Sequence, residues 1–222
     1  MQLFEQYRPQ SWSELIGQKH VATAIARMKQ RGDLGGRGFW LTGPSGTGKS
    51  TCAYLIAADV CDPDNFIEVD AGEITPARLA DLERSLRYRA IGDKPGRAVL
   101  INESHGLRQD SIRKLLVVLE RIPPWVVWIF TTTNLGQQQL LDGIDSAPLL
   151  SRCIEFRLEG KRYAERFAQR AMEIADVEGL GGAAFSEYVS LAQRCDFNLR
   201  KMLSCIEAGE LVREDAGLAI CA

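Results

Sequence analysis

Residues 43–50 read Gly43-Pro44-Ser45-Gly46-Thr47-Gly48-Lys49-Ser50, between an apolar run at residues 38–42 and a helix-like segment at residues 51–60. Glycines let the backbone N–H groups of such a loop turn inward around phosphate oxygens, and the following helix presents its positive end to them. A lysine at position 49 reaches the β- and γ-phosphates, and a hydroxyl at position 50 can ligate Mg²⁺. The stretch therefore predicts a P-loop that binds a nucleoside triphosphate.

Four further apolar runs follow within the first 158 residues, at Phe66–Asp70, Arg97–Asn102, Trp125–Thr132 and Arg152–Leu158. Helix-like segments lie before and between most of the runs, at Gln18–Gln30, Thr51–Val60, Pro76–Arg89 and Gln109–Glu120. Strands that alternate with helices predict parallel β-α-β units, with a sheet that is buried on both faces.

The sequence changes character after Leu158. From there on only helical patterns are found, at Lys161–Glu178, Ala183–Arg194 and Asn198–Ala208. We therefore predict two domains. Residues 1–159 form an α/β P-loop domain with a parallel five-stranded sheet flanked by helices, and residues 160–222 form a small all-helical lid domain.

The composition limits the class of protein. The chain has 222 residues, with 27 Lys and Arg against 29 Asp and Glu, and a net charge of −2. This balance excludes a protein whose whole surface is basic and attracts nucleic acid, although it allows a basic stripe on one face. No apolar run is long enough for a membrane helix, and the amino terminus is not a secretory signal, so we expect no membrane contact and a cytoplasmic location. The cysteines form no Cys-x-x-Cys pair, so we do not expect a structural zinc site.

A second chemical signal lies at residues 98–103, Ala-Val-Leu-Ile-Asn-Glu. P-loop enzymes usually end this strand with an Asp for the metal, and one branch follows it with a Glu that orients or deprotonates water. Here Asn102 stands at the metal position and Glu103 follows. An amide lacks the charge that favours Mg²⁺. Two interpretations remain: an ATPase with weaker metal binding, or a subunit that binds ATP and turns it over poorly.

Hydroxyl and amide groups end the run that starts at Trp125, at Thr131-Thr132-Thr133-Asn134. The carboxyl end of a central strand is where open α/β sheets bind ligands. One of these groups is therefore a candidate to position the attacking water or to touch the γ-phosphate. His105 follows Glu103 closely, and we expect it to pack or cap rather than to catalyse.

Several motifs together resemble those of clamp-loader AAA+ ATPases, the family of the replication factor C small subunits and the bacterial gamma/tau and delta-prime proteins. The motifs occur in the order and spacing of that family, and they are Tyr7-Arg8-Pro9, Ile16-Gly17-Gln18, Gly43–Ser50, Leu100–Glu103, Thr131–Asn134 and Ser151-Arg152-Cys153. The resemblance covers residues from about Gln6 to Ala208.

The resemblance implies that ATP and Mg²⁺ are bound. Arg8 and Ile16 would line the adenine and ribose pocket. The phosphates would lie in the loop formed by Gly43, Pro44, Ser45, Gly46, Thr47, Gly48, Lys49, Ser50 and Thr51, with the metal near Ser50 and Asn102.

The resemblance also implies catalytic roles. Glu103 would be the catalytic base and Thr133 the sensor on the fourth strand. Arg152 would be an arginine finger that acts on ATP held by a neighbouring subunit, since a permanently charged guanidinium neutralises charge on the γ-phosphate. Arg200, in Asn198-Leu199-Arg200-Lys201, would be the arginine of the second sensor.

The chain departs from the family in three further ways. It lacks the cysteine-rich zinc module of the gamma/tau proteins, and it stops at Ala222, where clamp loaders continue into a collar domain. The helix that tracks DNA in clamp loaders carries Arg108, Arg113 and Lys114, but Leu116 and Val117 replace the family's paired arginines. The chain is thus expected to be either a fragment or a two-domain relative that assembles differently.

Three interpretations follow. The first is a clamp-loader-type ATPase, with ATP between the α/β domain and the lid, that works with AAA+ neighbour subunits on DNA and a sliding clamp. The second is a hydrolysis-deficient, ATP-binding subunit of a hetero-oligomer that supplies Arg152 to a partner. The third is a small-molecule P-loop kinase, which would need neither the arginine finger nor the second sensor.

Overall fold

The computed structural model describes residues 1–32, 34–133, 147–159 and 163–211. The chain forms two compact units. One contains residues 18–44 and 48–158, and we call it the α/β unit; the other contains residues 1–17, 45–47 and the chain from residue 159 on, and we call it the helical unit. Asn134, which sequence reasoning singled out, lies outside the described residues.

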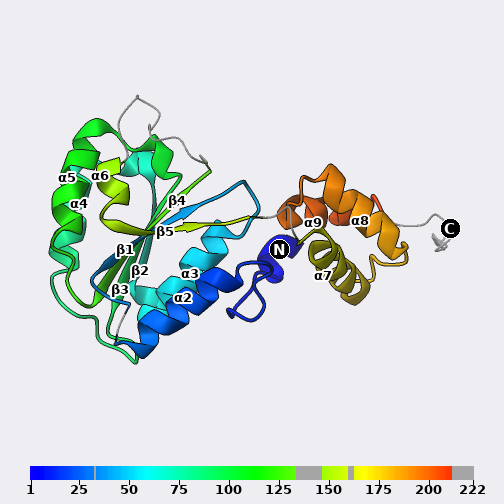
Figure 1. The fold of residues 1–222 in the computed structure, drawn as a ribbon, viewed down its shortest axis with the longest axis horizontal. Helices are drawn as coiled ribbons and strands as arrows, with labels where there is room; N and C mark the ends of the chain where they lie inside the picture. Colours follow the sequence, from blue (N-terminus) through cyan, green and yellow to red (C-terminus); the bar gives the residue numbers. More distant parts are fainter. Residues whose placement is uncertain (33, 134–146, 160–162, 212–222) are drawn as a thin grey trace, which may run out of the picture. The chain divides into compact units, whose positions relative to one another are not determined.

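The α/β unit is built on one parallel sheet, as predicted. Its strands are β1 (Arg37–Thr42), β2 (Phe66–Asp70), β3 (Arg97–Asn102), β4 (Val126–Thr132) and β5 (Cys153–Arg157). They lie in the order β2-β3-β4-β1-β5, and every neighbouring pair is parallel (Figure 1). All carboxyl ends therefore meet at one edge of the sheet, which we call the carboxyl edge, and all amino ends meet at the opposite amino edge.

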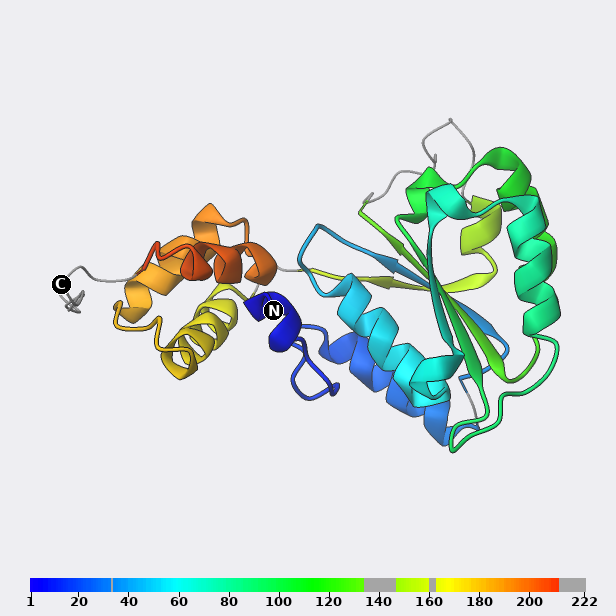
Figure 2. The same cartoon turned by 180° about the vertical axis from the view of Figure 1, so that it is seen from behind.

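Helices cover both faces of this sheet (Figures 1 and 2). Side chains of alternate residues point to opposite faces. One face, with Trp128 and Phe130, packs against α4 (Pro76–Ser85), α5 (Gln109–Leu119) and α6 (Ala147–Leu150). The other face carries α3 (Lys49–Val60), with α2 (Lys19–Gln30) beside it. Among the described residues, short 3-10 turns lie at Pro63–Asn65, Ala71–Glu73 and Ser104–Gly106.

The helical unit packs around its own core. Its helices are α1 (Leu3–Gln6), α7 (Ala164–Val177), α8 (Phe185–Arg194) and α9 (Leu199–Glu207). The core is formed by apolar side chains on one face of each longer helix, and it includes Leu3, Phe167, Ala171, Ile174, Tyr188, Leu191, Met202, Leu203 and Ile206. The all-helical character expected after Leu158 is present.

The amino-terminal segment differs from the domain division expected from the sequence, which placed residues 1–17 in the α/β domain. Leu3 is buried in the helical core, and Phe4 and Tyr7 pack against it. The Leu3 backbone N–H donates to Glu207 Oε1 at 2.9 Å, and the Tyr7 hydroxyl donates to Glu178 Oε1 at 2.6 Å. Apolar burial and two directed hydrogen bonds thus join this segment to the helical unit.

In the part of the chain that the structure describes, no helix has the length and hydrophobicity needed to cross a membrane.

Candidate active site

The predicted catalytic groups of the α/β unit other than Arg152 meet at the carboxyl edge, because β3, β4 and β1 are neighbours in the sheet. The P-loop follows β1, Asn102 and Glu103 end and follow β3, and Thr131–Thr133 end β4. Open α/β sheets bind their ligands at this edge. Segments far apart in the sequence therefore contribute to one site.

The P-loop has the backbone that its glycines predict. Gly46 and Gly48 have φ angles of 76° and 92°, a left-handed region that other residues rarely adopt. Gly48 is the N-cap of α3, so the positive end of that helix faces the loop. The Lys49 ammonium is only 7% exposed and donates to the carbonyl oxygens of Gly43, at 2.8 Å, and Pro44, at 2.9 Å. A helix end and a buried cation thus converge on a space suited to phosphate.

Asn102 is held on both sides of its amide group. Its Nδ2 donates to Glu68 Oε1, and its Oδ1 accepts a hydrogen bond from Thr131 Oγ1 at 3.0 Å. Glu68 Oε2 in turn accepts from the Tyr54 hydroxyl at 2.8 Å. Four side chains from α3, β2, β3 and β4 therefore form one hydrogen-bonded chain on the face of the sheet that carries α3.

Glu103 leaves β3 with an unusual backbone. Its φ and ψ are 49° and 48°, a left-handed conformation that costs a non-glycine residue of order 1 kcal/mol or more. The turn is held by Gly106 N–H, which donates to the Glu103 carbonyl at 2.8 Å, and by the buried Ser104 hydroxyl, which donates to Ile101 O at 3.0 Å. Strain at a carboxylate in a ligand-binding edge is typical of a functional residue.

His105 contacts the proposed base directly. Its Nδ1 lies 3.3 Å from Glu103 Oε2 and 3.5 Å from Thr132 Oγ1. The ring therefore lies between a carboxylate and a hydroxyl at the ends of two neighbouring strands. His105 therefore packs against the Glu103 carboxylate.

Arg152 lies at the other end of the sheet from the P-loop of its own chain. It directly precedes β5, whose first residue, Cys153, pairs with Gly38 near the start of β1. The P-loop follows the end of β1, about 13 Å farther along at the rise of a parallel strand. The guanidinium binds Glu120 Oε1, at 2.5 Å from Nη2, and the Pro148 carbonyl, at 2.8 Å from Nη1. Arg152 is thus directed away from the carboxyl edge.

Besides residues 45–47 of the P-loop, the predicted residues Arg8, Ile16 and Arg200 belong to the helical unit. Arg8 is half-buried, and Ile16 packs against the helical core. Arg200 is the second residue of α9. The first turn of this helix is capped by Asn198, whose Oδ1 accepts a hydrogen bond from the Lys201 N–H at 3.2 Å. The Arg200 guanidinium lies over the Phe4 ring, 4.9 Å from the ring centroid. Thr133, in the α/β unit, is half-buried one residue beyond β4.

Comparison with known proteins identifies the family. Residues 39–159, which include the P-loop and the Asn102–Glu103 pair, match the model of the ATPase family associated with various cellular activities (AAA). The chain belongs to this family. An AAA fold is a nucleotide-binding fold, in agreement with the P-loop geometry.

Individual relatives of this AAA protein are named as replication factor C small subunits and as DNA polymerase III gamma and tau subunits, which confirms the resemblance seen in the motifs. It is 27% identical over 231 residues to the replication factor C small subunit of Haloarcula marismortui, covering 97% of this chain and 66% of that protein. It is 29% identical over 182 residues to DNA polymerase III subunit gamma of Buchnera aphidicola, covering 71% of this chain and 47% of that protein. The chain thus spans less than two thirds of the length of these relatives.

A solved structure shows the same fold. The Thermotoga maritima RuvB Holliday junction branch migration motor superposes on the AAA protein with a TM-score of 0.68 and 24% sequence identity. The match covers 90% of this chain and 64% of the RuvB chain.

The side chains at the carboxyl edge fit a Mg²⁺ ion that is held mainly by nucleotide phosphates. Ser50, Asn102 and Glu68 offer oxygen atoms, the ligand type that Mg²⁺ prefers, and few carboxylates are needed because Mg²⁺ keeps several waters. Among the described residues, no group of three or more His, Cys, Asp and Glu side chains is arranged to hold a metal ion without a nucleotide.

The sequence did not point to two contact residues, Glu68 and Glu120, and it named Thr131 only as one of several candidates at the end of its strand. Glu68 and Thr131 contact Asn102, and Glu120 contacts Arg152. One signal was available: in the strand Phe-Ile-Glu-Val-Asp, a carboxylate at the third position shares a face with the last. Glu120 gave no comparable signal, because a glutamate at the end of an amphipathic helix is ordinarily a solvated residue.

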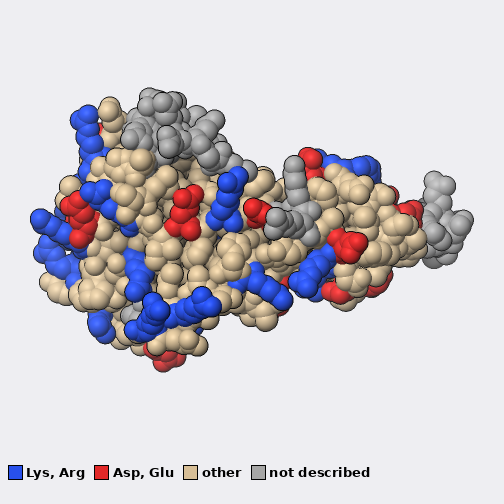
Figure 3. Space-filling model, viewed as in Figure 1, with Lys and Arg blue, Asp and Glu red and all other residues tan. Residues whose placement is uncertain are grey.

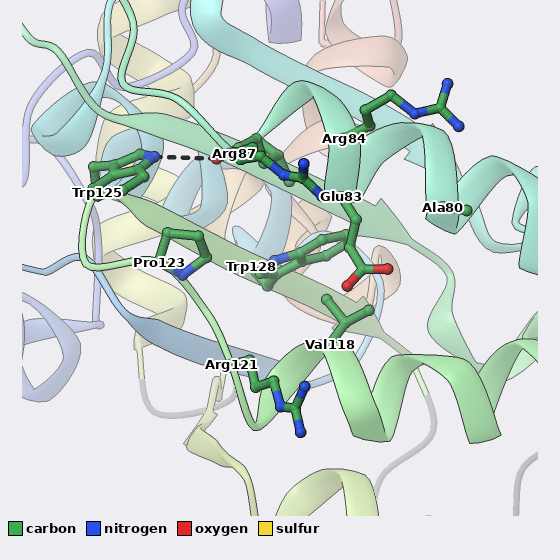
Figure 4. Close-up of a pocket in the computed structure, with 10 residues that line it drawn as sticks. Ala80, Glu83, Arg84, Arg87, Val118, Arg121, Pro123, Trp125 and Trp128 are labelled. Carbon is green, nitrogen blue, oxygen red and sulfur yellow. Dashed lines mark hydrogen bonds between the residues drawn. The ribbon is translucent and has the colours of Figure 1, made fainter.

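A separate pocket of about 320 Å³ lies on the opposite face of the sheet, between α4 and α5 (Figure 4). Trp125 and Trp128 form part of its wall, and the Trp125 indole N–H donates to the Leu86 carbonyl at 3.1 Å. Its other lining groups include Arg84, Arg87 and Arg121. None of the hydrogen bonds described above for Asn102, Glu103 or Lys49 reaches this pocket, so it is distinct from the nucleotide site.

Proposed function

We propose that this AAA protein is a clamp-loader-type ATPase, which binds ATP with Mg²⁺ at its P-loop and hydrolyses it together with a neighbouring AAA+ subunit. The P-loop geometry, the strained Glu103 and the clamp-loader names of its relatives support this proposal. The assembly would act on DNA and load or remodel a ring-shaped partner such as a sliding clamp.

The position of Arg152 is the observation that carries the proposal. The Arg152 guanidinium and the P-loop of the same chain lie at opposite edges of the sheet, separated by the length of β1. An arginine at the amino edge is of no use to the ATP of its own chain, but it is available to ATP held by an adjacent subunit. A planar, permanently charged guanidinium suits the γ-phosphate, where charge develops in the transition state.

The residues of the carboxyl edge suit phosphoryl transfer to water. Lys49 and the loop N–H groups bind the β- and γ-phosphates, and the Glu103 carboxylate accepts a proton from the water that attacks the γ-phosphorus. The bond between the γ-phosphorus and the bridging oxygen breaks, which yields ADP and inorganic phosphate. Mg²⁺, when bound, neutralises charge on the β- and γ-phosphate oxygens. His105 holds the Glu103 carboxylate in place.

The remaining predicted residues receive supporting roles in this proposal. Arg8 and Ile16 contact the adenosine part of ATP. Thr133 positions the attacking water from the end of β4, and Arg200 reaches the γ-phosphate from the helical unit when ATP is bound. Ser50 and Asn102 hold the metal.

Contact with DNA is proposed through α5. Arg108 and Arg113 are exposed at its amino-terminal half, whereas Lys114 forms an ion pair with Glu83 at 2.6 Å and is partly neutralised. Figure 3 shows basic side chains gathered at the end of the α/β unit where α4 and α5 lie in Figure 1. Such a patch would attract the phosphate backbone without reading sequence.

Asn102 favours a second candidate function, that of an ATP-binding subunit that does not hydrolyse ATP itself and only supplies Arg152 to a partner. An amide at the metal position removes one negative charge from the site. The two candidates share the P-loop and the arginine finger, and they differ only in turnover at the chain's own P-loop.

Mg²⁺-dependent ATP hydrolysis by the purified chain, with and without primed DNA, tests the proposal. Turnover that rises with protein concentration and disappears in Glu103→Gln, while ATP binding is retained, is the expected result. Glu155→Gln, an exposed glutamate on β5, is the matched control and should leave turnover unchanged. Tight ATP binding without turnover under every condition would instead establish the second candidate.

A further inference from the structure

The Asn102 amide lies against a carboxylate from another strand. Glu68 comes from β2 and Asn102 from β3. Asp70 pairs with Asn102, and Glu68 lies two residues before Asp70, so Glu68 and Asn102 are on the same face of the sheet. A carboxylate only accepts hydrogen bonds, so the amide nitrogen of Asn102 must face Glu68 and its oxygen must face Thr131. The hydrogen bonds therefore fix the orientation of the amide.

This face is the one that carries the P-loop helix. Tyr54 of α3 donates to Glu68 Oε2 at 2.8 Å, and its ring packs edge-on against Phe66, with 5.5 Å between ring centroids. Tyr54 lies one helical turn beyond Ser50, which is on the same side of α3. The Glu68 carboxylate is thus anchored to the helix that begins with the two metal- and phosphate-binding residues Lys49 and Ser50.

We propose that Glu68 supplies, beside Asn102, the negative charge that the Asn102 amide lacks at the metal site. This inference rests on the proposed nucleotide site. Mg²⁺ keeps several of its waters when it binds to proteins and phosphates. The Glu68 carboxylate, which lies beyond Asn102, would therefore attract the ion by its charge and accept hydrogen bonds from those waters. Asn102 then serves as the connection, since its amide holds Glu68 on one side and the Thr131 hydroxyl on the other.

The neighbouring acidic residues do not provide an equivalent arrangement. Asp70 lies opposite Asn102 in the strand register, but Glu68 makes the described hydrogen bond to the Asn102 amide. Glu103 leaves the strand in a left-handed turn, and its carboxylate contacts His105. Glu68 is accordingly the carboxylate that is fixed in position by Tyr54 and lies against the Asn102 amide.

Binding of a fluorescent ADP analogue, measured with excess EDTA and with saturating Mg²⁺, tests the proposal without using activity. The dissociation constant in EDTA divided by that in Mg²⁺ reports how much Mg²⁺ strengthens nucleotide binding. We expect Glu68→Gln to lower this ratio about tenfold, which corresponds to about 1.4 kcal/mol, and to leave binding in EDTA unchanged. Glu155→Gln, which removes an exposed carboxylate from β5, should change neither constant.

The exchanged double variant gives the sharper result. Glu68→Gln with Asn102→Asp restores one carboxylate and one amide in reversed positions, and we expect it to recover the Mg²⁺ effect of the wild type. Asn102→Asp alone places two carboxylates side by side, so we expect a lower Tm in EDTA that either Mg²⁺-nucleotide or the added Glu68→Gln change restores. The Tm series keeps the test decisive even if Glu68→Gln alone folds poorly.

Two results would overturn the inference: a Mg²⁺ effect in Glu68→Gln equal to that of the wild type, or a double variant no better than Glu68→Gln. In either case wild-type nucleotide binding would leave the proposed function standing. A wild-type chain that binds no nucleotide in EDTA or in Mg²⁺ would overturn both.

Discussion

Arg152 donates two hydrogen bonds to a single oxygen of Glu120, from Nη2 at 2.5 Å and from Nε at 3.2 Å. Glu120 caps the carboxyl end of α5, and Arg152 lies between α6 and β5, so the pair joins elements 32 residues apart in the sequence. The proposed arginine finger is therefore held in its own subunit by a carboxylate. When it acts on a neighbour's ATP, the γ-phosphate competes with Glu120 for the same guanidinium.

The first prediction concerns this competition. Glu120→Gln keeps the shape of the side chain but removes its charge, so Arg152 is more available to the neighbouring subunit. The pair is partly exposed, with side-chain exposures of 31% and 54%, and such pairs contribute about 0.2–1 kcal/mol. We expect turnover at subsaturating protein concentration to rise up to about fivefold, the factor that corresponds to the upper value.

ATP turnover as a function of protein concentration measures this effect. Glu73→Gln, an exposed glutamate far from Arg152 in the sequence, is the control that changes the same charge. A fall in turnover in Glu120→Gln would contradict competition, because it would mean that Glu120 aims Arg152 at the neighbour.

The second prediction concerns the P-loop cation. Lys49→Ala removes the ammonium that is buried against the loop carbonyls, and we expect the chain to lose its thermal stabilisation by ATP. A ligand at a hundred times its Kd stabilises the fold by about 2.7 kcal/mol, which raises Tm by roughly 5–10 °C in a domain of this size. Thermal unfolding with increasing ATP measures the shift. Arg27→Ala, which changes an exposed residue of α2, should retain the shift. A shift in Lys49→Ala equal to that of the wild type would contradict nucleotide binding at this site.

The third prediction concerns the core of the helical unit. Within the described residues, the buried Tyr188 hydroxyl has no hydrogen-bond partner, and burial raises the pKa of Tyr188. An unpaired buried hydroxyl is destabilising, so we expect Tyr188→Phe to raise the free energy of unfolding by about 1 kcal/mol. Tyr7→Phe is the matched control, because the Tyr7 hydroxyl donates to Glu178 at 2.6 Å, and it should not stabilise. Chemical denaturation measures both; a Tyr188→Phe variant less stable than the wild type would refute this account.

The parts of the fold that depend on local patterns were predictable from the sequence. Within the apolar run that ends at Thr132, the residues of β4, Val126–Thr132, are all buried, as a central parallel strand requires. The glycines at 46 and 48 adopt the left-handed angles that a phosphate-binding loop needs. In these cases the residues that decide the structure are neighbours in the chain, and their spacing carries the information.

The parts that depend on distant contacts were not predictable. Glu68 is 34 residues from Asn102, and their contact follows from the order of strands β2 and β3, which spacing alone does not determine. The same holds for Glu120 and Arg152. The grouping of residues 1–17 with the helical unit is likewise not apparent from the sequence, because the apolar side chains of Leu3 and Phe4 give no indication of which core they join.

The most direct test of the central claim, that Arg152 acts on the ATP of a neighbouring subunit, is to mix two inactive variants and measure ATP turnover. Lys49→Ala subunits supply Arg152 but bind no ATP, whereas Arg152→Ala subunits bind ATP but supply no finger. We predict that each variant alone is inactive and that their mixture hydrolyses ATP. A chain with both substitutions, mixed with Arg152→Ala, should remain inactive. A mixture as inactive as its components, or turnover by Arg152→Ala alone, would contradict the claim.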